Sequence, residues 1–451
     1  MKLEDTIVAL STPPGVGAIG VIRLSGSDSF DIFQKVFRGK NLSEAASHTA
    51  HFGLLADGEE IVDEVVATIF KGPHSYTKED VVEISCHGSP YILKRVIELF
   101  LREGARLAGP GEFTQRAFLH GRFDLAQAEA VADLIAAESK SAHDTAMKQM
   151  RGGFSNEIQQ LRERLIHFAS MIELELDFSE EDVEFASRDE LKALVLRIQQ
   201  VVTGLVNSFE LGNVLKNGIP VVIAGKPNAG KSTLLNALLN EERAIVSDIP
   251  GTTRDVIEDA INIDGVIFRF VDTAGLRETD DQIESIGVGK TKERMQQASV
   301  IIYLVDLEDV DGEDLRAQVE EVKALGVPYL VVGNKEDVAS VDGRLSGMLD
   351  LQISAKEKAH LDVLKSKLVE LSHVEAISAA DTIVTSSRHY EGLRNTSKAL
   401  DKVLEGIDSQ ITNDFLAMDI RASLNYLGEL TGDITTDDLL ENIFSKFCIG
   451  K

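Results

Sequence analysis

The sequence predicts a multidomain α+β protein in which an α/β domain is inserted into a helical domain. Its 451 residues suggest about three domains, at roughly 150 residues each. Strand patterns alternate with helical patterns in residues 216–377, as in a mostly parallel sheet. Long helical patterns occupy residues 116–215 and 378–451, on both sides of this block. We therefore expect these two stretches to pack together as one helical domain.

The first stretch, residues 1–115, has the pattern of a separate α+β domain. The runs TIVAL, AIGVIRL, EEIVDEVVATIF and VVEISCHG are short, alternating or apolar, and are separated by Gly and Pro turns, as strands are. The run YILKRVIELFLREG places Val96, Leu99 and Phe100 at helical spacing and stops at Gly104.

Composition favours a soluble cytoplasmic protein. No apolar run reaches the roughly 18 residues of a membrane span, and the N-terminus lacks the apolar stretch of a signal peptide. Two cysteines, Cys86 and Cys448, cannot form a disulfide framework. The net charge of −28 argues against an overall attraction to nucleic acid, although a local basic patch is compatible with it.

A complete phosphate-binding motif, G-x-x-x-x-G-K-[ST], follows the apolar run IPVVIAG. Glycines let the backbone N–H groups of such a loop point at phosphate oxygens, and the following helix adds its positive N-terminal end. Lys231 is expected to reach the β- and γ-phosphates, and the Ser232 hydroxyl to bind Mg²⁺. The expected nucleotide contacts in this loop are Asn228, Ala229, Gly230, Lys231, Ser232 and Thr233.

Three further elements follow in order. Asp272, Thr273, Ala274 and Gly275 come after the strand pattern FRFV, where an Asp can hold Mg²⁺ through water and the Gly N–H can meet the γ-phosphate. Asn334, Lys335 and Asp337 follow YLVVG, and Asp337 can accept two hydrogen bonds that guanine offers and adenine does not. Ser354, Ala355 and Lys356 come after the next strand and would support the guanine carbonyl. Together the four elements resemble the GTPases of the translation-factor-related class, which implies a Ras-like P-loop G domain in residues 216–377.

The hydrolytic machinery departs from that of the small GTPases. These place a water-orienting Gln after the DTAG element, where this chain has Leu276. The mobile loop before that element is expected to supply Thr253 to Mg²⁺. In a similar subset of GTPases, the phosphate-loop Asn and this mobile loop bind K⁺, which implies Asn228, Ser247, Ile249 and Thr252 as its ligands. The loop residues expected beside the nucleotide are Ser247, Asp248, Ile249, Pro250, Gly251, Thr252 and Thr253.

The outer segments resemble a known family over essentially the whole chain. The segments DTIVALSTPPGVGAIGVIRLSG, SYTKEDVVEISCHGS, GPGEFTQRAFLHGRFDLAQAEAVADLI and the final FCIGK are similar to those of the tRNA modification GTPase MnmE (TrmE) family. The resemblance implies modification of C5 of the tRNA wobble uridine, U34, with an aminomethyl or carboxymethylaminomethyl group. It also implies a homodimer, a heterotetramer with the FAD-dependent MnmG (GidA), and a one-carbon unit from 5-formyltetrahydrofolate or a related tetrahydrofolate.

Motif by motif, the resemblance places the folate at Arg23, Glu83, Arg122 and Lys451, and the water-orienting carboxylate at Glu284. The family often has Lys where this chain has Arg122, and the two cations are not equivalent at a close contact. Cys448 is a candidate nucleophile for C6 of uracil, or simply a structural cysteine.

A ribosome-assembly GTPase switch is the competing hypothesis, since its G domain would look the same. Such relatives carry a basic RNA-binding module, often with a GXXG loop, and this acidic chain shows none. A membrane-associated iron-transport GTPase does not fit, because the sequence has no transmembrane segment. The sequence leaves open which tRNAs are modified and how tRNA binds.

Overall fold

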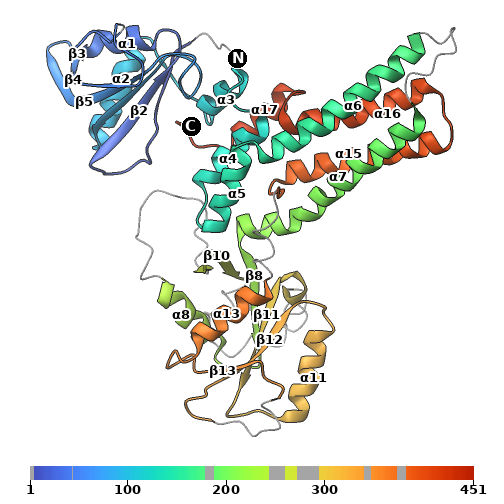
Figure 1. The fold of residues 1–451 in the computed structure, drawn as a ribbon. Helices are drawn as coiled ribbons and strands as arrows, with labels where there is room; N and C mark the ends of the chain where they lie inside the picture. The colour runs from blue at the N-terminus through green and yellow to red at the C-terminus, as the bar shows by residue number, and fades with distance from the viewer. Residues whose placement is uncertain are drawn as a thin grey trace.

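A computed structural model describes residues 5–42, 44–177, 187–242, 260–271, 294–339, 347–372 and 382–450. Figure 1 shows a sheet-and-helix body from the N-terminal part, an arm of long helices, and a second sheet body from the middle of the chain. The arm contains helices from both sides of the middle block, so the predicted insertion is confirmed.

The N-terminal body is built on a seven-stranded sheet in the order β3-β4-β5-β6-β2-β1-β7. Its named pairs are antiparallel except β1 with β7, which is parallel. The strands are β1 (Ile7–Leu10), β2 (Ile19–Ser25), β3 (Phe37–Arg38), β4 (Thr49–Asp57), β5 (Glu60–Phe70), β6 (Val81–His87) and β7 (Arg106–Leu107).

Helices α1 (Ser29–Val36) and α2 (Pro90–Arg102) cover one face of this sheet. Phe33 and Phe100 from these helices pack in one core with Ile22 and Ile84 from the strands. Because successive strand residues point to opposite faces, Arg23 and Glu83 lie on the other face. Part of that second face, at β1, is covered by α3 (Glu112–Leu119) through Phe113.

Long helices form the second body. They are α4 (Leu125–Ile135), α5 (Lys140–Met150), α6 (Gly153–Asp177), α7 (Arg188–Asn217), α15 (Ser387–Asp408), α16 (Asn413–Thr431) and α17 (Asp437–Phe444). Helices α6, α7, α15 and α16 share one core. Its buried residues include Ile158 of α6, Ile198 of α7, Leu400 of α15 and Leu427 of α16. Residues before and after the middle block therefore build one helical unit.

The middle body is a six-stranded sheet in the order β13-β12-β11-β8-β10-β9. Only the β9–β10 hairpin is antiparallel. The strands are β8 (Ile219–Gly225), β9 (Ala260–Ile263), β10 (Val266–Phe270), β11 (Val300–Asp306), β12 (Tyr329–Asn334) and β13 (Leu351–Ile353). Helices α8 (Lys231–Glu242) and α13 (Leu361–Leu371) pack on one face and α11 (Gly312–Lys323) on the other. This doubly covered, mostly parallel sheet confirms the predicted α/β fold of the block.

The middle body touches the helical body at its entry, its exit and one hairpin. The Ser208 hydroxyl of α7 accepts the backbone N–H of Val384, so the incoming helix and the outgoing chain lie together. At the hairpin, the Gly265 carbonyl accepts the backbone N–H of Ser141 at 3.3 Å and its hydroxyl at 3.0 Å. Since Ser141 is in the first turn of α5, this carbonyl satisfies a helix N–H that lacks a partner within the helix.

Candidate nucleotide and folate sites

The phosphate loop lies between β8 and α8, at the carboxyl end of a central parallel strand. Gly225, Asn228 and Gly230 have φ of +144°, +62° and +92°, which bend the loop tightly. A Cβ on Gly230 would lie 2.3 Å from Asn334 Nδ2, so this close approach requires glycine. The structure thus brings the phosphate loop together with the loop that begins at Asn334.

Lys231 has its ammonium group inside the turn of this loop. Its Nζ donates to the carbonyl oxygens of Gly225 at 2.9 Å and Lys226 at 2.8 Å. Ser232 follows at the start of α8, whose N-terminal dipole favours an anion. An ammonium, a hydroxyl and helix N–H groups fit a Mg²⁺-bound polyphosphate. Among the described residues, no cluster of His, Cys, Asp and Glu side chains forms a separate metal site.

Asn334 joins the phosphate loop to the loop after β13. It is 3% exposed; its Nδ2 donates to the Ala229 carbonyl at 2.8 Å, and its Oδ1 accepts the Ala355 N–H at 3.0 Å. One buried amide therefore fixes the spacing between the expected phosphate and base contacts.

Asp337 presents an ionised carboxylate at the expected base site. Its Oδ1 accepts the Ser354 hydroxyl at 2.6 Å, and this hydrogen bond, aided by Lys356 and Lys335, lowers the pKa of Asp337 below its usual value. The second carboxylate oxygen and the open surface leave it able to accept donors from a guanine.

Lys335 is oriented by two acids that the sequence analysis missed. Its Nζ lies 2.6 Å from Asp306 Oδ2 and 2.9 Å from Glu308 Oε2, and these hydrogen bonds raise the pKa of Lys335. Both acids lie at the end of β11, next to β12 in the sheet. In the sequence, these two acids were marked only by their position at the end of the predicted strand VIIYLVD.

Several predicted residues lie outside the described part of the chain. These are Ser247, Asp248, Ile249, Pro250, Gly251, Thr252, Thr253, Asp272, Thr273, Ala274, Gly275, Glu284 and Lys451. Their roles remain predictions.

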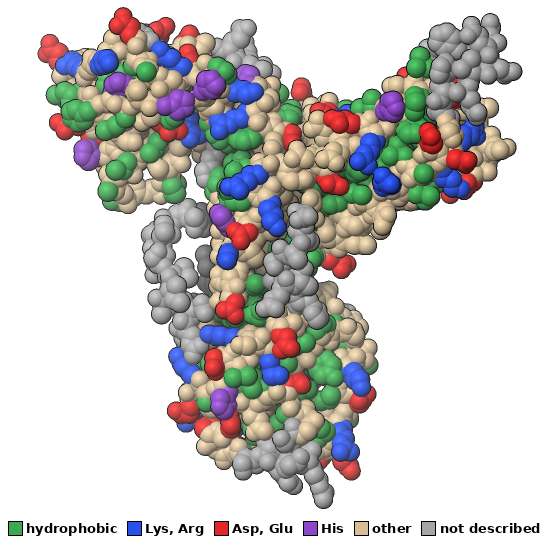
Figure 2. Space-filling view, in the orientation of Figure 1, with side chains coloured by type: hydrophobic (Ala, Val, Ile, Leu, Met, Phe, Trp, Pro, Cys, Tyr) green, Lys and Arg blue, Asp and Glu red, His purple; other side chains and the backbone are tan. Residues whose placement is uncertain are grey.

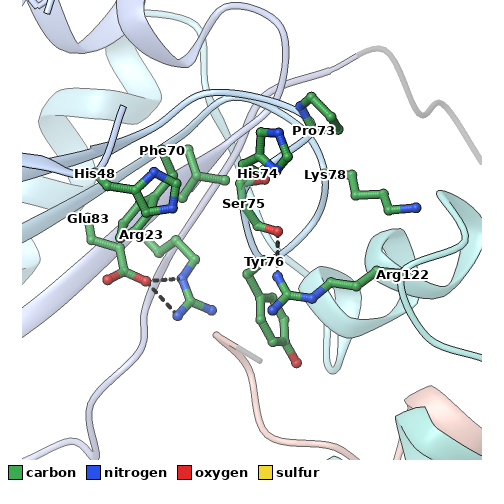
Figure 3. A pocket seen from close by; sticks show the side chains of 11 residues that line it. Arg23, His48, Phe70, Pro73, His74, Ser75, Tyr76, Lys78, Glu83 and Arg122 are labelled. Atoms are coloured by element: carbon green, nitrogen blue, oxygen red, sulfur yellow. Dashed lines mark hydrogen bonds and ion pairs between the residues drawn. The ribbon is translucent and has the colours of Figure 1, made fainter. Parts of the chain in front are cut away.

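A second candidate site is a cavity of about 510 Å³ on the open face of the N-terminal sheet (Figure 3). It is within the usual size range of small-molecule sites, roughly 300–1,000 Å³. Its lining residues are Arg23, His48, Phe70, Pro73, His74, Ser75, Tyr76, Lys78, Val81, Glu83 and Arg122. The cavity thus brings together Arg23, Glu83 and Arg122, which come from three separate motifs.

Arg23 and Glu83 meet because β2 and β6 place them directly opposite each other. Arg23 Nε and Nη2 donate to Glu83 Oε1 at 2.9 and 2.7 Å. The guanidinium carbons of Arg23 and Arg122 each lie 5.1 Å from the centre of the Tyr76 ring. Tyr76 thus contacts two cations through cation–π interactions, and nothing in the sequence analysis singled it out.

A buried charge network holds the wall of this cavity. Arg116 is fully buried and pairs with Asp5 at 2.5 Å, Glu79 at 3.0 Å and Glu112 at 3.1 Å. Glu79 in turn accepts the Ser25 hydroxyl at 2.6 Å. The network therefore ties the turn that carries Tyr76 to the start of the sheet.

The C-terminal tail reaches the same body. The Cys448 carbonyl accepts the Gly111 N–H at 3.2 Å, and the Gly450 carbonyl accepts the Ser11 hydroxyl at 3.2 Å. Cys448 is exposed, whereas Cys86 is buried, and burial raises the pKa of the Cys86 thiol to about 11. Of the two cysteines, only Cys448 is placed to react with a molecule in solvent.

Comparisons with known proteins match the whole length of the chain. A family model described as the GTP-binding protein TrmE N-terminus matches residues 6–122, and one described as the MnmE helical domain matches residues 125–448. The chain belongs to the MnmE family of tRNA modification GTPases. The tRNA modification GTPase MnmE of Cytophaga hutchinsonii is 60% identical over 99% of this chain and 98% of its own length. That of Christiangramia forsetii is 52% identical over 100% of both chains.

The residue ranges of the two family models follow the order of the bodies along the chain. The match to the MnmE helical domain runs across the middle body, because the middle body is inserted into the helical body. Within the described residues, no helix has the length and apolar content that crossing a bilayer requires.

Proposed function

We propose that this chain binds and hydrolyses GTP during the modification of tRNA. The observation that carries this is the joining of the phosphate loop to the base-binding loops by Asn334. Membership in the MnmE family supports the tRNA substrate. The test is nucleoside analysis of tRNA from cells that lack the gene, with and without a plasmid copy. Unchanged modification in the deletion strain would refute the proposal.

The reaction we propose is modification of C5 of wobble uridine 34, to an aminomethyl or carboxymethylaminomethyl group, with FAD-dependent MnmG (GidA). The family resemblance of the outer segments supports it. A reconstituted assay with both proteins, tRNA, GTP and a tetrahydrofolate derivative tests it. Omission of each component in turn should abolish the product, and formation of product without MnmG would contradict the partnership.

Hydrolysis is proposed to depend on K⁺, with Asn228, Ser247, Ile249 and Thr252 as ligands, and on Glu284 to orient water. Mg²⁺ is expected at Ser232 and Thr253. The support is the sequence pattern, above all Leu276 in place of a glutamine. GTP turnover should be markedly faster in K⁺ than in Na⁺, and equal rates would exclude the cation. Glu284→Ala should retain GTP affinity and lose most turnover.

The cavity on the N-terminal sheet is proposed to bind 5-formyltetrahydrofolate or a related tetrahydrofolate. Glu83, paired with Arg23, suits the N–H donors of a pterin, while Arg122 and Lys451 suit the carboxylates of the glutamate. Glu83→Gln should weaken binding of 5-formyltetrahydrofolate in calorimetry. Unchanged affinity would remove Glu83 from the site.

Cys448 is proposed as a nucleophile toward C6 of uracil, supported by its exposure and by the anchoring of the tail on the N-terminal body. Normal modification by a Cys448→Ser variant would eliminate this role.

A homodimer through the N-terminal body is also proposed. Phe52 and Val66 lie opposite each other on the open face of the sheet and are 67% and 40% exposed; Ile19 on the same face is 66% exposed. Apolar side chains gathered on a sheet face are typical of an interface. Sedimentation should give a dimer that Phe52→Glu weakens. The proposed domain borders are residues 1–115, 116–215 with 378–451, and 216–377.

A further inference from the structure

The proposed folate cavity has two ends of different charge. Figure 3 shows Arg23 and Glu83 on one side and Arg122 and Lys78 on the other. Both guanidinium groups contact Tyr76, which therefore lies between the two ends. At the first end the charge of Arg23 is balanced by Glu83, 2.7 Å away.

The second end has cations without acids. Lys78 Nζ donates to the Gly121 carbonyl at 2.8 Å, and Arg122 donates to the Ser75 carbonyl. Within the described residues, neither side chain has an ion pair with a carboxylate, and Glu83 is the one acid that lines the cavity. Neutral carbonyls orient these cations without neutralising them, so this end keeps a net positive charge in a chain whose net charge is −28.

Lys78 is held in an unusual backbone conformation. Its φ is +62°, in the left-handed region that residues with a Cβ rarely adopt. The turn around it is fixed by hydrogen bonds from the Ser75 hydroxyl to the Glu79 carbonyl, 2.6 Å, and between His120 Nδ1 and the Thr77 carbonyl, 2.7 Å. The surrounding structure therefore fixes where the Lys78 side chain leaves the backbone, and the hydrogen bond to Gly121 orients its ammonium group.

The two cations are adjacent along the path that a ligand tail would take. Lys78 bonds to Gly121, the residue before Arg122, and both side chains line the cavity, so one chain of carboxylates can reach both cations. A pterin that donates to Glu83 would occupy the first end. The glutamate of the same molecule would then point across Tyr76 to the second end.

We propose that Lys78, together with Arg122, binds the added carboxylates of an oligo-γ-glutamyl tail, so that the cavity prefers oligoglutamyl over monoglutamyl tetrahydrofolates. This inference rests on the proposed folate function. Each added γ-linked glutamate brings one further carboxylate. Two partly exposed ion pairs together give roughly a tenfold preference at low salt.

The test uses the full chain and isothermal titration calorimetry with 5-formyltetrahydrofolate as the monoglutamate and as the tri-γ-glutamate. The wild type should bind the triglutamate roughly tenfold more tightly at about 50 mM salt, and the preference should shrink at about 500 mM. Lys78→Gln should reduce it to roughly threefold or less without changing monoglutamate affinity, whereas Lys78→Arg should keep it.

Two controls separate charge from folding. Lys78→Gly removes the cation and relieves the left-handed backbone, so it should fold at least as well as the wild type and still lose the preference. Lys40→Gln removes one positive charge, as Lys78→Gln does, but Lys40 is an exposed residue outside the cavity. This variant should keep the preference for the triglutamate.

The outcomes are distinct. Equal affinity of the wild type for the two folates would overturn the inference and leave the folate function standing. An undiminished preference in both Lys78→Gln and Lys78→Gly would overturn the role of Lys78. Absence of binding of either folate to the wild type would refute the folate function itself.

Discussion

Replacement of Asn334 by alanine should weaken guanine nucleotide binding through the loops that this residue joins. The substitution leaves the Ala229 carbonyl and the Ala355 N–H without partners, and both residues are buried. An unsatisfied buried polar group costs about 1–3 kcal/mol, so the two together cost about 2–6 kcal/mol. Because this cost falls on the arrangement of the nucleotide-binding loops, affinity for GDP and GTP decreases by about 30-fold to 20,000-fold.

Titration with a fluorescent GDP analogue and calorimetry with GTP would measure this decrease. Asn334→Asp separates the two bonds, because a carboxylate can still accept from Ala355 but repels the Ala229 carbonyl. Glu336→Gln is the matched control on the same loop, since Glu336 pairs with exposed His360 at 2.9 Å and has no bond to the phosphate loop. Affinity of Asn334→Ala within threefold of the wild type would refute the reasoning.

Three further predictions follow from buried groups. An alkylating reagent at pH 8 should label Cys448 rapidly and Cys86 only after unfolding, because Cys86 is buried and its pKa is raised. Mass spectrometry of peptides would measure the two labelling rates, and fast labelling of Cys86 in the folded protein would contradict the prediction. Burial raises the pKa of Glu129, but His389 and Arg388 outweigh burial and lower this pKa to about 2. The ionised Glu129 therefore stabilises the fold above pH ~4.5, and this stabilisation is lost as the pH falls toward 2. Acid unfolding followed by circular dichroism should therefore be less steep below pH 4.5 in Glu129→Gln, and identical curves would count against it. Arg116→Met should destabilise the N-terminal body by about 3–5 kcal/mol, because three carboxylates lose a fully buried partner; hydrogen exchange of β1 would report the loss, and unchanged protection would disprove it.

Much of the fold followed from the sequence because the deciding patterns are local. The run Ile219–Gly225 is apolar and ends in a glycine-rich loop, and it forms β8 with those bounds. The helix predicted from Tyr91 to Gly104 is α2, which begins at Pro90 and ends at Arg102. Strands such as β4, with Phe52 exposed, carry a weaker pattern and were not predicted.

The sites divide in the same way. The nucleotide elements are contiguous motifs at strand ends, so a parallel sheet necessarily brings them together. The pairing of Arg23 with Glu83 depends on the register between β2 and β6, which no local pattern specifies. The motif SYTKED contains Tyr76 and Lys78, but only the folded turn shows that both line the cavity with Arg122.

The three attachments of the nucleotide-binding block have a mechanical consequence. Its incoming helix and outgoing chain touch at Ser208 and Val384, so the two ends of the block leave the helical body side by side. The bond from Ser141 to Gly265 is a third attachment, made by the hairpin of the block rather than by its ends. Along the chain this hairpin lies between Thr253 and Asp272, two of the proposed nucleotide contacts, so the bond to Ser141 belongs to the segment that joins them. Within the described residues, the hairpin therefore offers a link between the nucleotide elements and the helical body that is separate from the two ends of the block.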